Sequence, residues 1–259
     1  MGGRGSNSKI QRRTPPIQPQ QPQQQIPINQ TPVVQNAVGV LSSMSDDQLA
    51  QLMQQSKSVD MPNHLNDAVD ATQKFVYKAG LNEQPQVLDD AAFQQYLQDN
   101  HIPQSDVLAR SVGGANYTVN GVTMRLTPQQ VVDMMKYSAL NYVGGKHGGQ
   151  VYGAGTYFDR NGGNNTGYAR GATAVAVLNP ATAKVIDKAT LQSQIPQFIQ
   201  SHPKFARAVG GSSGSRVSSD VLSIYALAMG YNVITDSRTN PRYHNVIDRA
   251  ALVFRKSNA

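Results

Sequence analysis

The sequence predicts an α+β fold, and three observations support this prediction. Helix-like stretches with capping residues come first, short strand-like stretches ended by turn residues follow, and the two kinds do not alternate as regular βαβ units. The chain has 259 residues, of which 39% are hydrophobic and 15% charged, which is enough for one or two domains. We expect a disordered basic arm over residues 1–43, a helical lead-in over 44–105 and an α+β domain over 106–259.

The N-terminal arm is rich in glycine, proline and glutamine. Residues 1–40 contain no acid, and their few large apolar side chains cannot offset the entropy lost on folding. The basic residues of this segment are Arg4, Lys9, Arg12 and Arg13. We expect the arm to be disordered, either fully solvated or in weak contact with nucleic acid.

Three helices are expected in the lead-in. The first begins after Ser45, an N-cap residue that is followed by two aspartates. The second spans Asp67 to Lys78 and stops at Gly80, and the third begins at Asp89-Asp90 and ends before Pro103.

The domain that follows is expected to open with strands. Residues 107–112 form the first strand, and Asn120-Gly121 between alternating residues indicates a β-hairpin. Thr127-Pro128 then starts a helix that is expected to end at Gly144-Gly145 and to pack across the sheet. The later expected elements are a strand at Thr156–Phe158, strands at Ala172–Leu178 and Lys184–Ile186, a helix from Thr190 that contains Pro196, a helix over Ser219–Met229, and strands near Asn232–Thr235 and Asn245–Phe254.

Composition excludes several classes of function. The chain has no cysteine, so disulfides, thiolate nucleophiles and iron–sulfur clusters are excluded. No histidine pair has the spacing of a metal site, and we expect no metal. No apolar run is long enough for a membrane span or a secretory signal, so we expect a soluble protein with no membrane contact and no secretion by a signal peptide. Glu83 is the sole glutamate, which excludes any mechanism that needs one in the C-terminal half.

The densest group of candidate functional residues lies at positions 152–158, which read Tyr-Gly-Ala-Gly-Thr-Tyr-Phe. Tyr168 follows eleven residues after Tyr157. Glycines before a strand let a ligand approach the backbone, and two tyrosines can hold a planar ring between them. Alternatively, Gly153 and Gly155 form a tight turn and the tyrosines pack in the core.

In this respect the chain resembles ADP-ribosyltransferases over roughly residues 106–256. That superfamily has a basic residue at the end of its first strand, then a Tyr-Gly-x-Gly-x-Tyr-Phe segment and then a second tyrosine; Arg110, positions 152–158 and Tyr168 are similar to these features in the same order. The resemblance implies a split-sheet fold and NAD as substrate. The residues that it places at NAD are Arg110 and Ser111 at the pyrophosphate or ribose, Tyr152, Gly153 and Gly155 along the ligand, and Tyr157 and Tyr168 at the nicotinamide.

The chain departs from the family at the catalytic glutamate of a late strand. The available carboxylates there are Asp248, which we take as the catalytic candidate, and Asp236. An aspartate reaches about 1.5 Å less than a glutamate, and a misplacement of that size can cost ~10²-fold in rate. Asp248 is alternatively a partner of Arg249 or a backbone cap.

Two functions therefore remain open. The first is an NAD-dependent mono-ADP-ribosyltransferase or NAD glycohydrolase, and the second is a non-catalytic protein of the same fold that binds a capsid. The opening Met-Gly-Gly-Arg-Gly-Ser and the residues 246–252 resemble the ADP-ribosyltransferase-like proteins found among tailed-phage and prophage head genes. This resemblance implies a place in the virion or in the host bacterial cytoplasm, with a host protein acceptor or a phage head protein as partner.

Overall fold

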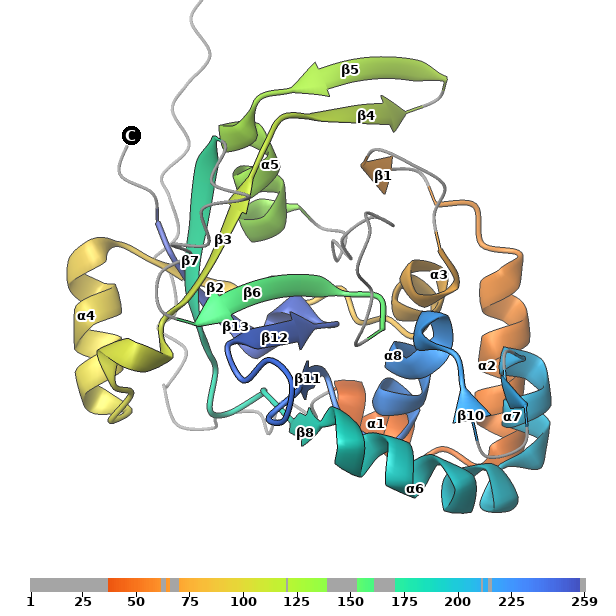
Figure 1. Cartoon of the computed structure of the whole chain (residues 1–259). Helices are drawn as coiled ribbons and strands as arrows, with labels where there is room; N and C mark the ends of the chain where they lie inside the picture. The colour runs from red at the N-terminus through yellow and green to blue at the C-terminus, as the bar shows by residue number, and fades with distance from the viewer. Residues whose placement is uncertain are drawn as a thin grey trace, which may run out of the picture. The chain divides into compact units, whose positions relative to one another are not determined.

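The computed structural model describes residues 37–61, 64–65, 70–119, 121–138, 153–160, 171–210, 212–213 and 216–256. All of them belong to one compact unit, Gln35–Ala259. The described part is a mixed α+β structure built around a large mixed sheet (Figure 1), which confirms the fold class in its coarse form.

Three of the described helices begin at a capping box. Ser45, Asp70 and Thr127 each accept a hydrogen bond from the backbone N–H three residues later, and the glutamine at that position accepts one from the cap residue. The helices are α1 (Ala37–Ser42), α2 (Asp46–Lys57), α3 (Ala71–Lys78), α4 (Asp90–Asp99), α5 (Pro128–Tyr137), α6 (Lys188–Ser201), α7 (Pro203–Val209) and α8 (Ser219–Ala228), with the short 3-10 helices η1 (Gln104–Asp106) and η2 (Arg249–Ala251).

The main sheet has eight strands in the order β2-β13-β7-β3-β6-β12-β11-β8 among the described residues. The β2–β13 and β8–β11 pairs are parallel, and the other neighbours are antiparallel. Its strands are β2 (Gln86–Leu88), β3 (Leu108–Val112), β6 (Thr156–Arg160), β7 (Ala172–Leu178), β8 (Val185–Asp187), β11 (Val233–Thr235), β12 (Tyr243–Val246) and β13 (Leu252–Arg255).

Two smaller sheets accompany the main one. The predicted hairpin is present as β4 (Ala115–Val119) and β5 (Val122–Leu126), and β1 (His64–Leu65) pairs with β4. Gly121 has a φ of 78° in the turn, a conformation that glycine adopts without steric cost. The other small sheet pairs β9 (Ser212–Ser213) with β10 (Arg216–Val217).

The structure differs from the expected elements in several places. Helix α1 lies within the range expected for the arm, because Val38 and Leu41 are buried beside α8. Strand β2, from the expected helical lead-in, joins the main sheet. Helix α5 ends at Tyr137, because Ser138 has an extended backbone. The strand expected near 245–254 is two strands, β12 and β13, separated by η2.

Each face of the main sheet has its own hydrophobic core. Leu108, Phe158 and Phe254 point to the face covered by α5, which we call the α5 face. Ile186 and Ile234 point to the opposite face, where they pack with residues of α1, α2, α3, α6, α7 and α8. We call this second side the helical face. Val177 and Val253 also point to this side, where they pack against α4.

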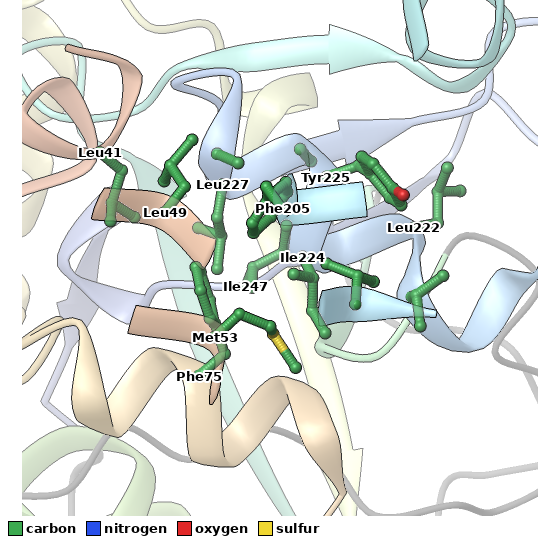
Figure 2. Packing of buried hydrophobic residues seen from close by; sticks show 14 of the residues in the cluster. Leu41, Leu49, Met53, Phe75, Phe205, Leu222, Ile224, Tyr225, Leu227 and Ile247 are labelled. Atoms are coloured by element: carbon green, nitrogen blue, oxygen red, sulfur yellow. The ribbon is translucent and has the colours of Figure 1, made fainter. Parts of the chain in front are cut away.

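The core of the helical face is dense with aromatic and aliphatic side chains (Figure 2). Phe205 lies between Phe75 and Tyr225, with ring centroids 6.3 and 5.7 Å away, and all three side chains are fully buried. Asp46 at the start of α2 accepts hydrogen bonds from the backbone N–H groups of Lys204 and Phe205 at the start of α7. This carboxylate therefore joins two helices that are far apart in the sequence.

Candidate functional site

The candidate site residues gather at one end of the main sheet. Strands β6 and β7 begin at this end, while β3 and β12 end there, since these neighbours are antiparallel. Arg110, Ser111, Gly153, Gly155 and Tyr157 are all found at this end of the sheet. Tyr152 and Tyr168 lie outside the described residues.

Arg110 connects strand β3 to strand β6. Its Nη1 atom donates a hydrogen bond of 2.8 Å to the backbone carbonyl oxygen of Tyr157, and its side chain is half-buried. The facing residue on β7 is Ala174, whose small side chain leaves room for the arginine stem. Next to it, the Ser111 and Thr173 hydroxyl groups form an exposed 3.0 Å hydrogen bond.

The side chains of Arg110 and Tyr157 leave the sheet on opposite faces. Side chains alternate along a strand, and directly opposed residues of neighbouring strands share a face. Arg110 is opposite Ala174, which belongs to the core of the α5 face. Tyr157 is opposite Asn245 and packs against the core of the helical face. A ligand that touches both side chains must therefore pass around this end of the sheet.

The Gly153–Gly155 turn packs tightly against α8 and β12. Gly153 has a φ of 89°, and a Cβ atom there would lie 2.3 Å from Ser223 Oγ. A Cβ atom on Gly155 would lie 1.7 Å from Asn245 Oδ1. Glycine is therefore required at both positions by packing inside the protein, which agrees with the tight-turn interpretation of these two residues.

Two buried polar residues hold this turn and were not singled out from the sequence. Ser223 Oγ donates to the Ala154 carbonyl oxygen at 2.6 Å, and Asn245 Nδ2 donates to the Gly153 carbonyl oxygen at 3.2 Å. Both side chains are completely buried. Ser223 is a polar residue between apolar neighbours, and this is the sequence signal that could have identified it, because buried polar groups need specific partners; Asn245 follows Arg242 and His244 and has no such signal.

Asp248 is a capping residue in the structure. It lies between β12 and β13 and not on a strand, and its Oδ1 accepts a 3.1 Å hydrogen bond from the Ala250 backbone N–H at the start of η2. Only 2% of its surface is exposed. The expected alternative of a backbone cap is thus present, and a ligand can reach the carboxylate only if the surrounding residues move.

The neighbouring Arg249 is a buried cation at the C-terminal end of α5. Its guanidinium donates to the carbonyl oxygens of Met134 and Met135, both at 3.2 Å, and to that of Ser138. Burial lowers the pKa of Arg249 to about 10, while the charge of Asp248 acts in the opposite direction. The side chain stays protonated at neutral pH and adds a cationic donor at the C-terminal end of the helix, where the Met134 carbonyl oxygen also accepts from the Ser138 backbone N–H.

The other expected carboxylate, Asp236, is also committed to local structure. It accepts hydrogen bonds from the backbone N–H groups of Arg238 and Thr239 and from the Thr239 hydroxyl. The bond from the Thr239 backbone is the largest influence that lowers the pKa of Asp236. Asp236 therefore stabilises the turn between β11 and β12 as a carboxylate.

A third carboxylate, Asp159, lies on the same strand and face as Tyr157. It is 5% exposed and forms a two-point ion pair with Arg242, with distances of 3.2 and 2.9 Å. On the opposite face of the sheet, His244 is 4% exposed, and burial lowers its pKa. Sequence reasoning did not select Asp159, although its position two residues after Tyr157 places both on one side of a strand.

The described residues contain no group of three or more histidine, aspartate or glutamate side chains arranged to hold a metal ion. None of the helices in the described part is both long and apolar enough to cross a membrane. We compared the chain with models of protein families, with curated proteins and with solved structures, and none of these comparisons gave a match.

Proposed function

We propose that the protein is an ADP-ribosyltransferase-like protein that binds NAD at the end of the main sheet where Arg110 and Tyr157 meet. The observation that carries this proposal is the 2.8 Å hydrogen bond from Arg110 to the Tyr157 carbonyl oxygen. This bond brings together two features that are 47 positions apart in the sequence and that resemble the arginine and tyrosine segments of that superfamily. Strand β12, the late strand of the resemblance, is the other neighbour of β6.

The residues supply two kinds of contact for a dinucleotide. A guanidinium can donate two parallel hydrogen bonds to pyrophosphate oxygens, and that of Arg110 lies at this end of the sheet, where its Nη1 atom donates to the Tyr157 carbonyl oxygen. Tyr157 offers an aromatic ring for the nicotinamide, and the hydrogen-bonded hydroxyl groups of Ser111 and Thr173 lie on the same face of the sheet as Tyr157, opposite to the Arg110 side chain, for the ribose or phosphate. Tyr152 and Tyr168 are expected to complete the ligand contacts.

Turnover would transfer ADP-ribose to a protein acceptor or to water. The bond between the nicotinamide nitrogen and the ribose carbon breaks and nicotinamide leaves with the electron pair. The acceptor atom then bonds to the positively charged ribose carbon and releases its proton to water. A carboxylate stabilises that charge, and Asp248 is our candidate for it. Because Asp248 is buried and caps η2, we expect turnover to be slow.

A second candidate function, a non-catalytic protein that binds a capsid, is favoured by the burial of Asp248. Asp248 already has a structural role, since it caps η2 and lies beside the buried charge of Arg249. In this case the protein retains the fold and binds NAD without consuming it. We place either form of the protein in a phage virion or in the host bacterial cytoplasm.

Calorimetric titration with NAD tests the binding proposal. We expect heat of binding with the wild type, its loss in Arg110→Ala and Tyr157→Ala, and partial retention in Arg110→Lys, because lysine presents a point charge and not a planar fork. Arg125→Ala and Tyr137→Ala are matched controls at exposed positions. Absence of binding by the wild type at millimolar NAD, weaker than about −4 kcal/mol, would refute the proposal.

Incubation with labelled NAD and a bacterial lysate separates the two candidate functions. If the enzyme is active, Asp248→Asn is expected to lower kcat by ~10²–10³ and to leave NAD affinity nearly unchanged. Asparagine can still cap η2, so a loss of activity would not reflect a lost cap. If Asp236→Asn and not Asp248→Asn abolishes activity, Asp236 is the catalytic carboxylate. Absence of label transfer and of NAD hydrolysis by the wild type selects the non-catalytic function.

A further inference from the structure

The Tyr157 ring is anchored through its hydroxyl group. Tyr157 Oη donates a 2.6 Å hydrogen bond to the Gly153 carbonyl oxygen, four residues earlier in the chain. The same oxygen accepts the 3.2 Å bond from Asn245 Nδ2. A carbonyl oxygen has two lone pairs, so one backbone atom connects the aromatic ring to strand β12.

Ser223 extends this connection to helix α8. Its hydroxyl group donates to the Ala154 carbonyl oxygen at 2.6 Å and accepts from Asn245 Nδ2 at 3.4 Å. Ser223 and Asn245 are fully buried, and Ala154 is 1% exposed. Hydrogen bonds that are shielded from water in this way keep more of their strength than exposed ones.

The turn also has little freedom to shift. The missing side chains of Gly153 and Gly155 are replaced in space by Ser223 and Asn245, respectively. A displacement of the Gly153 carbonyl toward α8 or β12 would therefore bring backbone into contact with side-chain atoms. Tight packing and hydrogen bonds thus act on the same carbonyl group.

We infer that Ser223 and Asn245 are positioning residues for the nicotinamide end of bound NAD. They hold the Gly153–Gly155 turn, the turn holds the Tyr157 hydroxyl, and the hydroxyl sets the orientation of the ring that stacks on nicotinamide. This inference rests on the proposed function. It assigns a ligand-specific effect to two residues that touch no ligand.

The inference predicts a selective change in affinity. ADP-ribose contains the pyrophosphate and both riboses of NAD but lacks nicotinamide, so it depends on Arg110 and not on the Tyr157 ring. Loosening the turn is therefore expected to weaken NAD binding and to leave ADP-ribose binding unchanged. A general loss of folding would weaken both ligands equally.

The experiment is a calorimetric titration of NAD and of ADP-ribose into the wild type, Ser223→Ala, Tyr157→Phe and the double variant. We expect each single variant to raise the ratio of the two dissociation constants, NAD over ADP-ribose, about tenfold, the equivalent of one hydrogen bond. The double variant is expected to show no further increase, because both changes break the same connection.

Ser56→Ala is the matched control. Ser56 is also fully buried and donates one 2.7 Å hydrogen bond to a backbone carbonyl, that of Met53 in α2. Its removal is expected to lower stability to a similar degree without changing the ratio. Asn245→Asp retains shape but places an acceptor against the Gly153 carbonyl, and we expect the same change in ratio if it folds.

The outcomes separate the inference from the proposed function. If the wild type binds NAD and Ser223→Ala leaves the ratio unchanged, or if the two single effects simply add, the inference is wrong and the proposed function stands. If the wild type binds neither ligand, the proposed function fails and the inference fails with it.

Discussion

Gly153 and Gly155 allow two interpretations at the level of the sequence, and the side chains around them distinguish their roles. Ser223 and Asn245 occupy the space that a side chain on either glycine would need. The requirement for glycine is therefore explained by packing within the protein, whether or not NAD also contacts this turn. Because the backbone of this turn lies so close to Ser223 and Asn245, the Gly153 carbonyl oxygen can accept hydrogen bonds from both Asn245 and Tyr157.

Gly155→Ala tests this steric requirement. The new methyl group would overlap Asn245 Oδ1, so the variant is expected to be less stable by about 1–3 kcal/mol or more, as in other overpacked sites. Gly39→Ala is the control, because Gly39 lies in helix α1 with nothing within 4 Å of the added atom. That variant is expected to gain up to about 1 kcal/mol from helix propensity. Urea unfolding midpoints compare the two, and an unchanged midpoint for Gly155→Ala would contradict the packing argument.

At the scale of elements, Arg249 joins η2 to the end of α5. One guanidinium donates to the carbonyl oxygens of Met134, Met135 and Ser138, at the C-terminal end of the helix where intrahelical donors run out. The negative end of the helix also attracts the cation. This contact fixes the connection between β12 and β13 against the helix that covers the α5 face.

Arg249→Met is expected to destabilise the protein by about 2–4 kcal/mol, since it removes a buried cation that donates to three carbonyl groups. Arg249→Lys should retain only part of the stability, because one ammonium group cannot reproduce the planar fork. Arg255→Ala, which removes a half-exposed pair with Asp90 at 3.4 Å, should cost less than about 1 kcal/mol. Chemical unfolding of the three variants measures these differences, and equal losses for Arg249→Met and Arg255→Ala would argue against the cap.

Asp187 connects the start of α6 to the turn after β11. It accepts hydrogen bonds from the Ser237 hydroxyl, the Ser237 backbone N–H and the Ala189 backbone N–H, at 2.6, 2.8 and 2.9 Å. These bonds lower the pKa of Asp187 from 3.8 to about 2, and the bond from the Ser237 hydroxyl has the largest effect. Its ionised form is therefore favoured in the folded state.

A carboxylate whose pKa is lower in the folded than in the unfolded state stabilises the folded protein. This stabilisation is fully present at pH values above the unfolded-state pKa and is lost as the pH falls through the folded-state pKa. The difference in unfolding free energy between the wild type and Asp187→Asn is thus expected to be constant above about pH 5 and to shrink between pH 3.8 and about 2. Urea unfolding at several pH values gives this difference. A difference that does not vary with pH would show that the carboxylate charge is not what these donors stabilise.

On the scale of the whole molecule, the two cores share strands of one sheet. Tyr157 and Phe158 are neighbours on β6, but the first packs on the helical face and the second on the α5 face. Val233 and Ile234 on β11 divide in the same way. Neither core can lose its strands without exposing the other.

We therefore expect a single unfolding transition for residues 35–259. Phe205→Ala on the helical face and Phe254→Ala on the α5 face should each cost about 3–5 kcal/mol, and each should shift the entire transition. Far-ultraviolet circular dichroism and tyrosine absorbance of the same samples test this coupling. Two transitions, with each variant affecting a different one, would mean that the faces fold independently.

Much of the local structure could be predicted from short-range signals. Ser45, Asp89 and Thr127 cap the helices that they were expected to cap, and β7 has the expected bounds. The hairpin at Asn120-Gly121 is also confirmed. These features depend on interactions within a few residues, such as capping bonds and alternation, and a sequence displays such interactions directly.

By itself, the sequence determined the α+β class, the starts of α2, α4, α5 and α8, the absence of cysteine and the set of acids from which any catalytic carboxylate must come. Only the tertiary structure decided that Arg110 and Tyr157 leave the sheet on opposite faces and that Ser223 and Asn245 hold the glycine turn. The physical reason is that strand register and the packing of remote helices depend on contacts between residues tens to more than a hundred positions apart. Local propensity and residue spacing do not indicate which remote residues form those contacts.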